Sequence, residues 1–512
     1  MKSRFSYDRL PYPSKFFVQA FPDRLATNAT LFGMSPADPA TSRVLELGCG
    51  NGSNLIAQAY LWPDASFVGV DLAQVHIDDA NSAAAELGLT NVEFRQMDVA
   101  DMSAADFGTF DYIVAHGLFS WVPEFVRQRV LEIFAELLNP SGVGYLSYSV
   151  LPGAYARKPA QDAMRFVSRE VSEPEPKVAR ALSFLKFLAE NTAADSTYRA
   201  LLEDELVRHR THLAADIFHD DLSELNAPFY FHEFADHLGQ HGLQYLSEAE
   251  LHAMGGGGLP QPARDFIASL DSVIEREQYL DHFRGRAFRQ TLFCRKDIDL
   301  DRQPAPAVVD NFLVLSSLRA ESKHPDLASE KIEKFVGTGG VGIEIDRPLV
   351  KAMLVRLGDH WPRAISFLEL ADQGKSLLSG TSIEPREVEI ARTVILQIAM
   401  QSRMVELHLF QPDRAVEPGE RPAINALARL QMRSAEHVIT GLGIDMKIKD
   451  AVSRTLLELM DGTRDRRTLA KEMSDFIGSA PDITDRADLL RSLPSWIDDS
   501  IANLGRIGMF QA

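Results

Sequence analysis

The pattern of apolar and polar positions divides the chain into two parts of different character. In the first part, short apolar runs of strand length alternate with stretches of helical periodicity, which is typical of a doubly wound α/β domain with a parallel sheet. One such stretch, residues 22–32, is predicted to be a helix that precedes the sheet. The five strands predicted in this part are residues 44–47, 66–71, 91–98, 110–115 and 142–149.

The strands that would complete such a sheet do not follow promptly. Residues 151–235 have helical periodicity and predict a helical insertion. The order helix, glycine, short strand over residues 234–246 predicts the sixth strand, and a single helix is expected over residues 262–283. Apolar and polar residues then alternate over residues 289–295, which predicts an antiparallel seventh strand at the edge of the sheet.

Beyond a proline-containing segment at residues 301–306, interpreted as a linker, the pattern becomes mostly helical. Three helices followed by a short strand are predicted twice, which suggests two modules resembling winged helices. The third helix of each module carries acidic residues, so a packing or protein-recognition role is favoured over DNA reading. We expect four domains: a core at 1–155, a helical insertion and regulatory region with the last two sheet strands at 156–300, and winged-helix-like domains at 310–410 and 424–512.

Composition limits the classes of function. At 512 residues the chain is too long for one hydrophobic core, and its net charge of −19 disfavours unaided nucleic-acid binding. Only two cysteines are present, so no disulfide framework is implied and a reducing, cytoplasmic setting fits. The first residues lack the apolar core of a signal peptide, and no apolar run is long enough for a membrane span.

The glycine turn after the first strand indicates the cofactor. A dinucleotide site requires G-x-G-x-x-G, whereas the glycines here fall at Gly48, Gly50 and Gly52, and Glu46 places a carboxylate at the strand end. A carboxylate would repel a pyrophosphate, but it suits the ammonium and sulfonium of S-adenosylmethionine (SAM). Taken alone, the motif also fits an ordinary glycine turn.

Acidic residues at the next strand ends strengthen this interpretation. Asp71 stands where a carboxylate would bind a ribose diol, Asp98 could accept from the adenine amino group, and His116 follows the fourth strand. All of them would meet at the carboxyl edge of the sheet, where ligands bind in open α/β folds. The predicted cofactor-binding set is Glu46, Gly48, Cys49, Gly50, Gly52, Asn54, Asp71, Leu72, Asp98, Val99 and His116.

Two other features of the sequence bear on function. Six histidines between His209 and His241 lack zinc-ligand spacing and accompanying cysteines, so no metal site is predicted. The aromatic, proline-rich arm at residues 7–21 is expected to pack on the domain, and it could also cover the cofactor pocket.

Several segments resemble a known family. Residues 24–33, 45–54, 116–123 and 151–153 are similar to the rickettsial outer-membrane-protein lysine methyltransferases, and more broadly to bacterial class I SAM-dependent methyltransferases with a methyltransferase regulatory domain. Residues 226–234 resemble the start of the regulatory region, and residues 456–464 resemble the family's C-terminal winged helix. Ala154 departs from the pattern, because a tryptophan usually stands there.

The resemblance implies a SAM-dependent methyltransferase that modifies lysine side chains of a protein. His116, Trp121 and Tyr148, at or just after the ends of the fourth and fifth strands, are the predicted lining of the acceptor channel and the candidate catalytic residues. The expected partner is a protein with exposed lysines, and a homodimer is left open. Two alternatives remain: a methyltransferase for a small molecule or a nucleic acid, and a non-catalytic binding protein.

Overall fold

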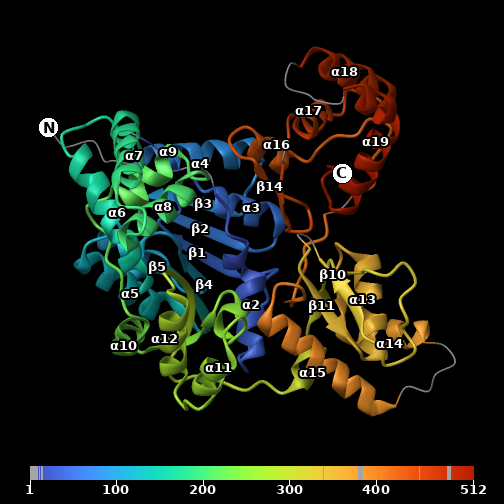
Figure 1. The fold of residues 1–512 in the computed structure, drawn as a ribbon, viewed down its shortest axis with the longest axis horizontal. Helices are drawn as coiled ribbons and strands as arrows, with labels where there is room; N and C mark the ends of the chain where they lie inside the picture. The colour runs from blue at the N-terminus through green and yellow to red at the C-terminus, as the bar shows by residue number, and fades with distance from the viewer. Residues whose placement is uncertain are drawn as a thin grey trace.

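The computed structural model describes residues 10, 12, 15–337, 340–378, 384–414, 416–448, 450–480 and 486–511. Its largest element is a seven-stranded sheet in the order β3-β2-β1-β4-β5-β7-β6, in which β7 runs opposite to the other six strands (Figure 1). This is the predicted doubly wound methyltransferase-type sheet. Its strands are β1 (Arg43–Leu47), β2 (Ser66–Asp71), β3 (Val92–Gln96), β4 (Phe110–Ala115), β5 (Leu138–Ser149), β6 (Leu243–Glu248) and β7 (Phe288–Arg295).

The central strands are buried because helices cover both faces of the sheet. Val44, Leu45, Tyr112 and Ile113 have no exposed surface, as expected for strands covered on both sides. Strand β5 begins four residues earlier than predicted, and its register with β4 shifts between Phe110 and Tyr112. The helical elements of this part are η1 (Val18–Ala20), α2 (Pro22–Leu31), α3 (Ser53–Leu61), α4 (Gln74–Glu86), η2 (Val99–Asp101), η3 (Ala104–Asp106), η4 (Phe119–Trp121) and α5 (Glu124–Leu137).

The helical insertion between β5 and β6 is present as predicted and has its own small apolar core, which includes Met164, Leu185 and Leu202. It contains α6 (Gly153–Ser168), α7 (Pro174–Asn191), α8 (Thr197–His209), α9 (Ala214–Asp216), the π-helix η5 (Ile217–Asp221) and α10 (Phe231–Gln240). After β6 come η6 (Leu251–Met254), α11 (Gln261–Ala268) and α12 (Val273–Arg284).

The prediction of one helix over residues 262–283 was wrong, because α11 and α12 are separate. The Ser272 hydroxyl accepts a hydrogen bond from Glu275 N at 3.3 Å and begins α12. A serine side chain used in this way favours a new helix start over continuation of the preceding helix.

The second half of the chain contains the two predicted helical groups, and the second of them has a further short helix before its three predicted helices. The first combines α13 (Pro348–His360), α14 (Phe367–Leu377) and α15 (Pro385–Gln401) with the antiparallel sheet β12-β8-β13. Its other elements are η7 (Pro306–Asn311), β8 (Leu313–Leu315), β9 (Arg319–Ala320), β10 (Glu333–Val336), β11 (Gly342–Ile345), β12 (Ile365–Ser366) and β13 (Glu406–His408). The second group contains α16 (Ala426–Met432), β14 (His437–Ile439), β15 (Asp445–Lys447), α17 (Ala451–Leu459), α18 (Arg466–Ser479) and α19 (Arg486–Arg506).

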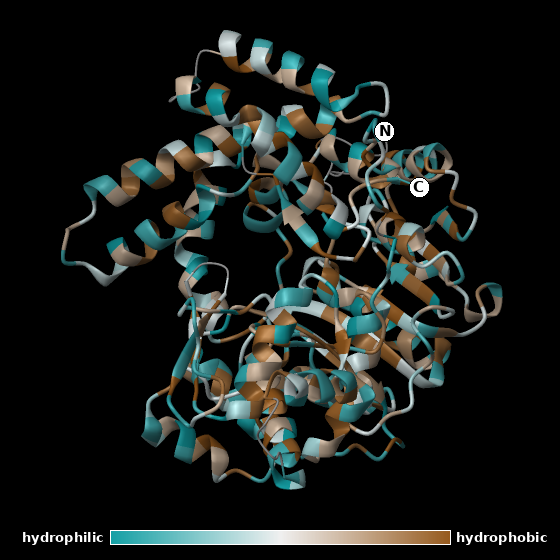
Figure 2. Ribbon diagram, turned by 90° about the vertical axis from the view of Figure 1, so that its right-hand side faces the viewer, coloured by the Kyte–Doolittle hydropathy of each residue, from teal (hydrophilic) through white to brown (hydrophobic). Residues whose placement is uncertain are grey.

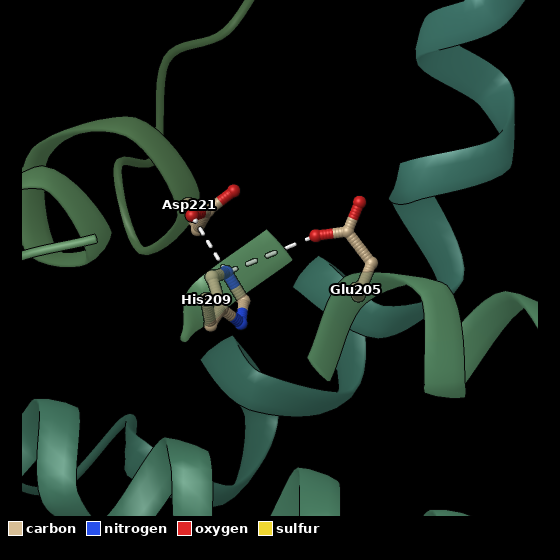
Figure 3. A group of neighbouring side chains, drawn as sticks. All are labelled: Glu205, His209 and Asp221. Atoms are coloured by element: carbon tan, nitrogen blue, oxygen red, sulfur yellow. Dashed lines mark hydrogen bonds and ion pairs between the residues drawn. The ribbon is translucent and has the colours of Figure 1, made fainter. Parts of the chain in front are cut away.

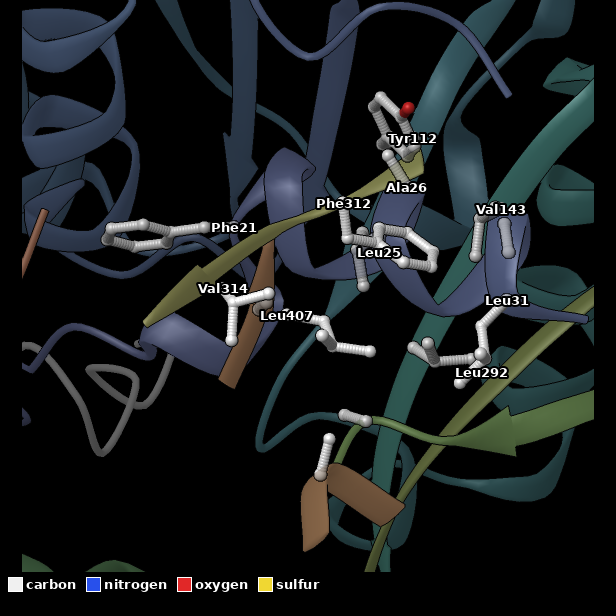
Figure 4. Close-up of a cluster of buried hydrophobic side chains, with 14 of the residues drawn as sticks. Phe21, Leu25, Ala26, Leu31, Tyr112, Val143, Leu292, Phe312, Val314 and Leu407 are labelled. Atoms are coloured by element: carbon white, nitrogen blue, oxygen red, sulfur yellow. The ribbon is translucent and has the colours of Figure 1, made fainter. Parts of the chain in front are cut away.

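Helix α2 joins the catalytic sheet to the first C-terminal group. Figure 4 shows Leu25 and Leu31 of α2 in one cluster with sheet residues such as Val143 and residues of the C-terminal half such as Phe312 and Leu407. Hydrophobic residues occupy much of the strands in Figure 2, whereas hydrophilic and hydrophobic residues are interleaved along the outer helices. The two parts therefore share one continuous apolar core.

Polar contacts reinforce this junction. Asp23 of α2 is 4% exposed and accepts hydrogen bonds from His408 Nδ1 at 2.7 Å, Leu409 N at 2.9 Å and Phe410 N at 2.7 Å. The segment interpreted as a linker is also held in place, since Arg302 donates to the carbonyls of Tyr245 and Leu246 in β6. Residues 301–306 are therefore part of the packed junction and not a free tether.

Candidate active site

The glycine turn brings the start of α3 to the carboxyl edge of the sheet. Gly48, Gly50 and Gly52 have φ angles of +70°, +55° and +72°, which favour glycine over every other residue. The amides of Gly48 and Cys49 both donate to Val70 O of the neighbouring strand, at 2.8 and 3.1 Å. The turn is therefore fixed to the ends of β1 and β2 before any ligand binds.

The two strand-end aspartates are held by backbone amides. Asp71 accepts from Gly50 N and Ala73 N, both at 2.9 Å, and Asp98 accepts from Ala100 N at 2.9 Å at the start of η2. Each carboxylate oxygen keeps lone pairs for a ligand hydroxyl or amine. A Cβ added at Gly50 would meet no atom within 4 Å, so open space lies beside the turn.

Glu46 is the buried carboxyl group of the site. It is 3% exposed, its Oε1 accepts from Asn54 Nδ2 at 3.0 Å, and its Oε2 is buried without a hydrogen-bond partner among the described residues. Burial raises the pKa of Glu46 to about 8, against the opposing effect of the Asn54 hydrogen bond. A ligand cation would offset this burial penalty and a phosphate would add to it, so the site fits the cationic, phosphate-free SAM.

His116 lies just after β4 and is enclosed by aromatic residues. Its Nδ1 is 2.8 Å from the Tyr145 hydroxyl, and the Phe17 ring stacks on it with centroids 3.5 Å apart. Burial lowers the pKa of His116 to about 3, so the imidazole is neutral at physiological pH. Sequence reasoning missed Tyr145; its only signal was the aromatic residue within the fifth predicted strand.

The N-terminal arm packs on the domain, as predicted for the part of it that the structure describes. Phe17 N donates to Asn54 Oδ1 at 3.0 Å, next to Glu46. Further out, Lys15 Nζ contacts Asp216 Oδ1 at 2.6 Å and so fastens the arm to the helical insertion. Residues 7–9, 11, 13 and 14 lie outside the described residues, and the role of the arm as a cover over the cofactor stays a prediction.

Trp121 and Tyr148 differ in their surroundings. Trp121, in η4, is partly buried, and its Nε1 has no partner among the described residues. Tyr148 has no exposed surface; its hydroxyl is 3.1 Å from Thr291 Oγ1 and its ring stacks on Phe234 at 4.1 Å. This differs from the expected lining of an acceptor channel, because successive residues of β5 face opposite sides of the sheet and Tyr148 faces the core beneath α10.

The remaining predicted cofactor residues lie near the same edge with different exposure. Cys49 is buried within the glycine turn, and Val99 is buried at the start of η2. Leu72 follows β2 and is 38% exposed. The structure thus brings the ends of β1, β2, β3 and β4 to one edge, with Glu46 in β1, Asp71 at the end of β2, Asp98 after β3 and His116 after β4.

One cluster has side chains of the kinds that bind metals, but its carboxylates form ion pairs with arginines. Glu205, His209 and Asp221 approach one another in the helical insertion (Figure 3), with His209 Nε2 at 3.0 Å from Asp221 Oδ2. Arg208 Nη2 contacts Glu205 and Asp221 at 2.7 and 2.8 Å, and Arg157 Nη2 contacts Asp221 at 2.9 Å. The two guanidinium groups already balance the two carboxylates, so the cluster is interpreted as an ion-pair network joining α6, α8 and η5.

None of the helices in the described part of the chain combines the length and apolar character that a bilayer crossing needs.

Comparison with protein-family models matches three segments. Residues 44–142 match a methyltransferase domain, residues 214–295 match a predicted methyltransferase regulatory domain, and residues 420–506 match the PKMT C-terminal winged helix domain. The first contains the glycine turn and the strand-end acids, and the second contains β6 and β7 of the same sheet.

Individual relatives extend these matches over nearly the whole chain. RP789 of Rickettsia prowazekii is 30% identical over 473 residues, which are 90% of this chain and 84% of that protein. RP028 of the same organism is 32% identical over 235 residues, covering 46% of this chain and 94% of RP028. The solved structure of PKMT2 from Rickettsia typhi in complex with AdoHcy matches with a TM-score of 0.83 at 26% identity, covering 98% of this chain and all of that one. The chain therefore belongs to one family with RP789, and it is a SAM-dependent methyltransferase with a regulatory domain and a C-terminal winged helix domain.

Proposed function

We propose that the protein transfers methyl groups from SAM to lysine side chains of a protein substrate. The match over 98% of the chain to PKMT2, solved with AdoHcy, is the observation that carries this proposal. Glu46, Asp71 and Asp98 would hold the ammonium, ribose and adenine of the cofactor, around the turn of Gly48, Gly50 and Gly52. Cys49, Asn54, Leu72, Val99 and His116 would complete the cofactor site.

The chemistry required of the protein is positioning and exclusion of water. When bound, SAM supplies a methyl group on a sulfonium that a neutral amine can displace. A free lysine has a pKa of about 10.4, so it must lose its proton before attack. The neutral His116 and the aromatic rings of Phe17 and Tyr145 make a low-polarity wall that favours the uncharged amine. We assign His116 and Trp121 to the part of the site that would receive the lysine. Tyr148 could contact the lysine only if its side chain left its packing against Phe234.

The two C-terminal groups of helices are proposed to recognise the protein substrate or to control its access. The third helices carry Glu387 and Glu389 in α15 and Asp498 and Asp499 in α19, which suits a basic protein partner better than DNA. We also propose a cytoplasmic location, since Cys49 and Cys294 are both free, buried thiols. A small-molecule methyltransferase is less well supported, because such a substrate needs no second half of this size.

Labelled-methyl transfer tests the proposal directly. The full-length protein is incubated with methyl-labelled SAM and a dialysed bacterial lysate, and labelled products are identified by mass spectrometry. Label on lysine side chains of protein is expected, and it should disappear when Asp71→Ala removes the proposed ribose partner. Label confined to RNA, carboxylates or small molecules would contradict lysine as the acceptor.

SAM binding is expected to release a proton from Glu46. With a pKa of about 8, this carboxyl is about 90% protonated at pH 7 in the free protein. A bound cation favours the ionised form, so affinity should rise about tenfold per pH unit below pH 8 and level off above it. Calorimetry in buffers of different ionisation enthalpy should show close to one proton released per SAM at pH 7.

Glu46→Gln is the matched control, because glutamine can still accept the Asn54 hydrogen bond. It should bind SAM more weakly and without proton release or pH dependence. Equal proton release by wild type and Glu46→Gln would show that another group titrates.

A further inference from the structure

The loop between η5 and α10 lies against the carboxyl edge of the sheet. Ala227 N donates to Ser120 O at 2.8 Å, and Phe229 N donates to Ser149 O at 3.2 Å. Leu151 N in turn donates to Phe229 O at 2.9 Å. These bonds hold the loop between the turn after β4 and the end of β5, and they place Asn226 one residue from the first of them.

Two polar atoms at this junction are buried and lack partners among the described residues. One is the acceptor Asn226 Oδ1, and the other is the donor Trp121 Nε1, on the residue after Ser120. The groups around them are satisfied: Ser120 Oγ accepts from Ser149 N at 2.8 Å, and Ser147 Oγ accepts from Gly117 N at 2.8 Å. Buried polar atoms are nearly always paired, so unpaired ones at a site call for a specific explanation.

The charged and titratable groups near the loop do not supply that partner. Arg127 lies over the Phe229 ring at 5.4 Å and donates to Val122 O, and His237 lies 6.0 Å from the same ring. Glu224 is exposed, and Glu233 Oε2 accepts from Tyr230 N at 3.0 Å. Within the described residues, Asn226 Oδ1 is thus left as a neutral acceptor beside the strand ends where the methyl group would lie.

We propose that Asn226 Oδ1 accepts a hydrogen bond from the acceptor amine and orients its lone pair toward the methyl group. The inference rests on the proposed lysine methylation. The lysine ammonium first gives its proton to water, and the neutral amine then donates one N–H to Asn226. Its lone pair forms the new N–C bond as the S–CH3 bond breaks and that electron pair passes to sulfur; the methylated ammonium then releases a proton. An amide oxygen suits this role because a carboxylate would stabilise the unreactive ammonium.

The test compares Asn226→Ala and Asn226→Asp with Leu225→Ala, a neighbour that is 47% exposed in the same loop. Transfer to lysine is measured under single-turnover conditions with methyl-labelled SAM and the dialysed lysate. Asn226→Ala should lower the rate at least tenfold with unchanged affinity for SAM and AdoHcy, and Leu225→Ala should match the wild type. Asn226→Asp should move the alkaline midpoint of the pH–rate profile upward by about one pH unit or more, a shift that a purely structural role would not cause.

Two results would overturn the inference: a wild-type rate for Asn226→Ala, or an unshifted pH profile for Asn226→Asp. If Asn226→Ala does not fold, the isosteric Asn226→Asp decides alone. Parallel loss of SAM affinity and rate in Asn226→Ala would assign the residue to the cofactor site and also reject the proposal. A wild-type protein that places no label on lysine rejects the proposed function itself, whereas a wild type and an Asn226→Ala variant that label lysine equally reject only the role of Asn226.

Discussion

Replacement of Gly52 by alanine is expected to abolish measurable SAM binding. Gly52 has a φ of +72°, and a Cβ there would lie 2.6 Å from Phe94 Cζ and 2.9 Å from Ala80 Cβ. A left-handed backbone costs a non-glycine residue about 1–2 kcal/mol, and overpacking adds about 1–3 kcal/mol. The least costly relief is displacement of the turn, which carries Gly50 away from Asp71, the acceptor of its amide, so affinity should fall by more than about 100-fold.

Substitutions at two further glycines distinguish the effect of backbone strain from that of a disturbed cofactor site. Gly88 also has a positive φ, of +65°, with no atom near an added Cβ, and it lies at the end of α4. Gly88→Ala should therefore show the backbone strain without loss of affinity. Gly50→Ala should show similar strain together with weaker SAM binding, because its Cβ enters the open space beside the turn. Calorimetry measures the affinity for SAM, and thermal unfolding measures the loss of stability. Full SAM affinity in Gly52→Ala would reject the assigned role of the turn.

The seven-stranded sheet could be predicted because its signals are local. Apolar runs such as residues 44–47 are buried on both faces, and the glycines that follow require a turn in any context. The sheet β11-β10-β9 was missed for the opposite reason: its strands are two to four residues long, and Phe335 and Ile345 are the only buried residues in them. The shared core around α2 could not be predicted either, because Asp23 and His408 are far apart in sequence and come into contact only in the folded chain.

The same contrast between local signals and contacts distant in sequence applies to the candidate site. Strand-end residues such as Glu46 and Asp71 are placed by the backbone alone, because parallel strands bring their carboxyl ends to one edge. The enclosure of His116 depends on Phe17 and Tyr145, which lie far away in sequence. Tyr145 and Tyr148 are three positions apart in one strand and therefore face opposite sides. Sequence alone could not show which tyrosine would contact His116, and the candidate that it offered, Tyr148, packs on Phe234 instead.

Arg289→Met is expected to cause the largest loss of stability. The Arg289 side chain has no exposed surface and pairs with Glu248 at 2.5 Å, Asp281 at 2.9 Å and Glu277 at 3.0 Å. Its guanidinium also lies 3.9 Å from the centre of the Phe231 ring. Removing the cation leaves three buried carboxylates in contact range, and breaking a buried pair in this way costs about 3–5 kcal/mol. Urea unfolding at pH 7.5 measures the loss.

The pH dependence of that loss identifies its electrostatic origin. Burial already raises the pKa of Glu277 to about 6 and raises that of Asp281 in the presence of the arginine, and without the arginine these two pKa values should rise further. Folded Arg289→Met would then bind more protons than its unfolded chain, so its stability should recover as the pH falls from 7.5 to 5.5. Arg286→Met is the matched control, because Arg286 reaches the same three carboxylates only at 3.3–4.0 Å. Equal losses in the two variants, or a loss in Arg289→Met that is independent of pH, would mean that packing against Phe231 and not charge neutralisation is what Arg289 provides.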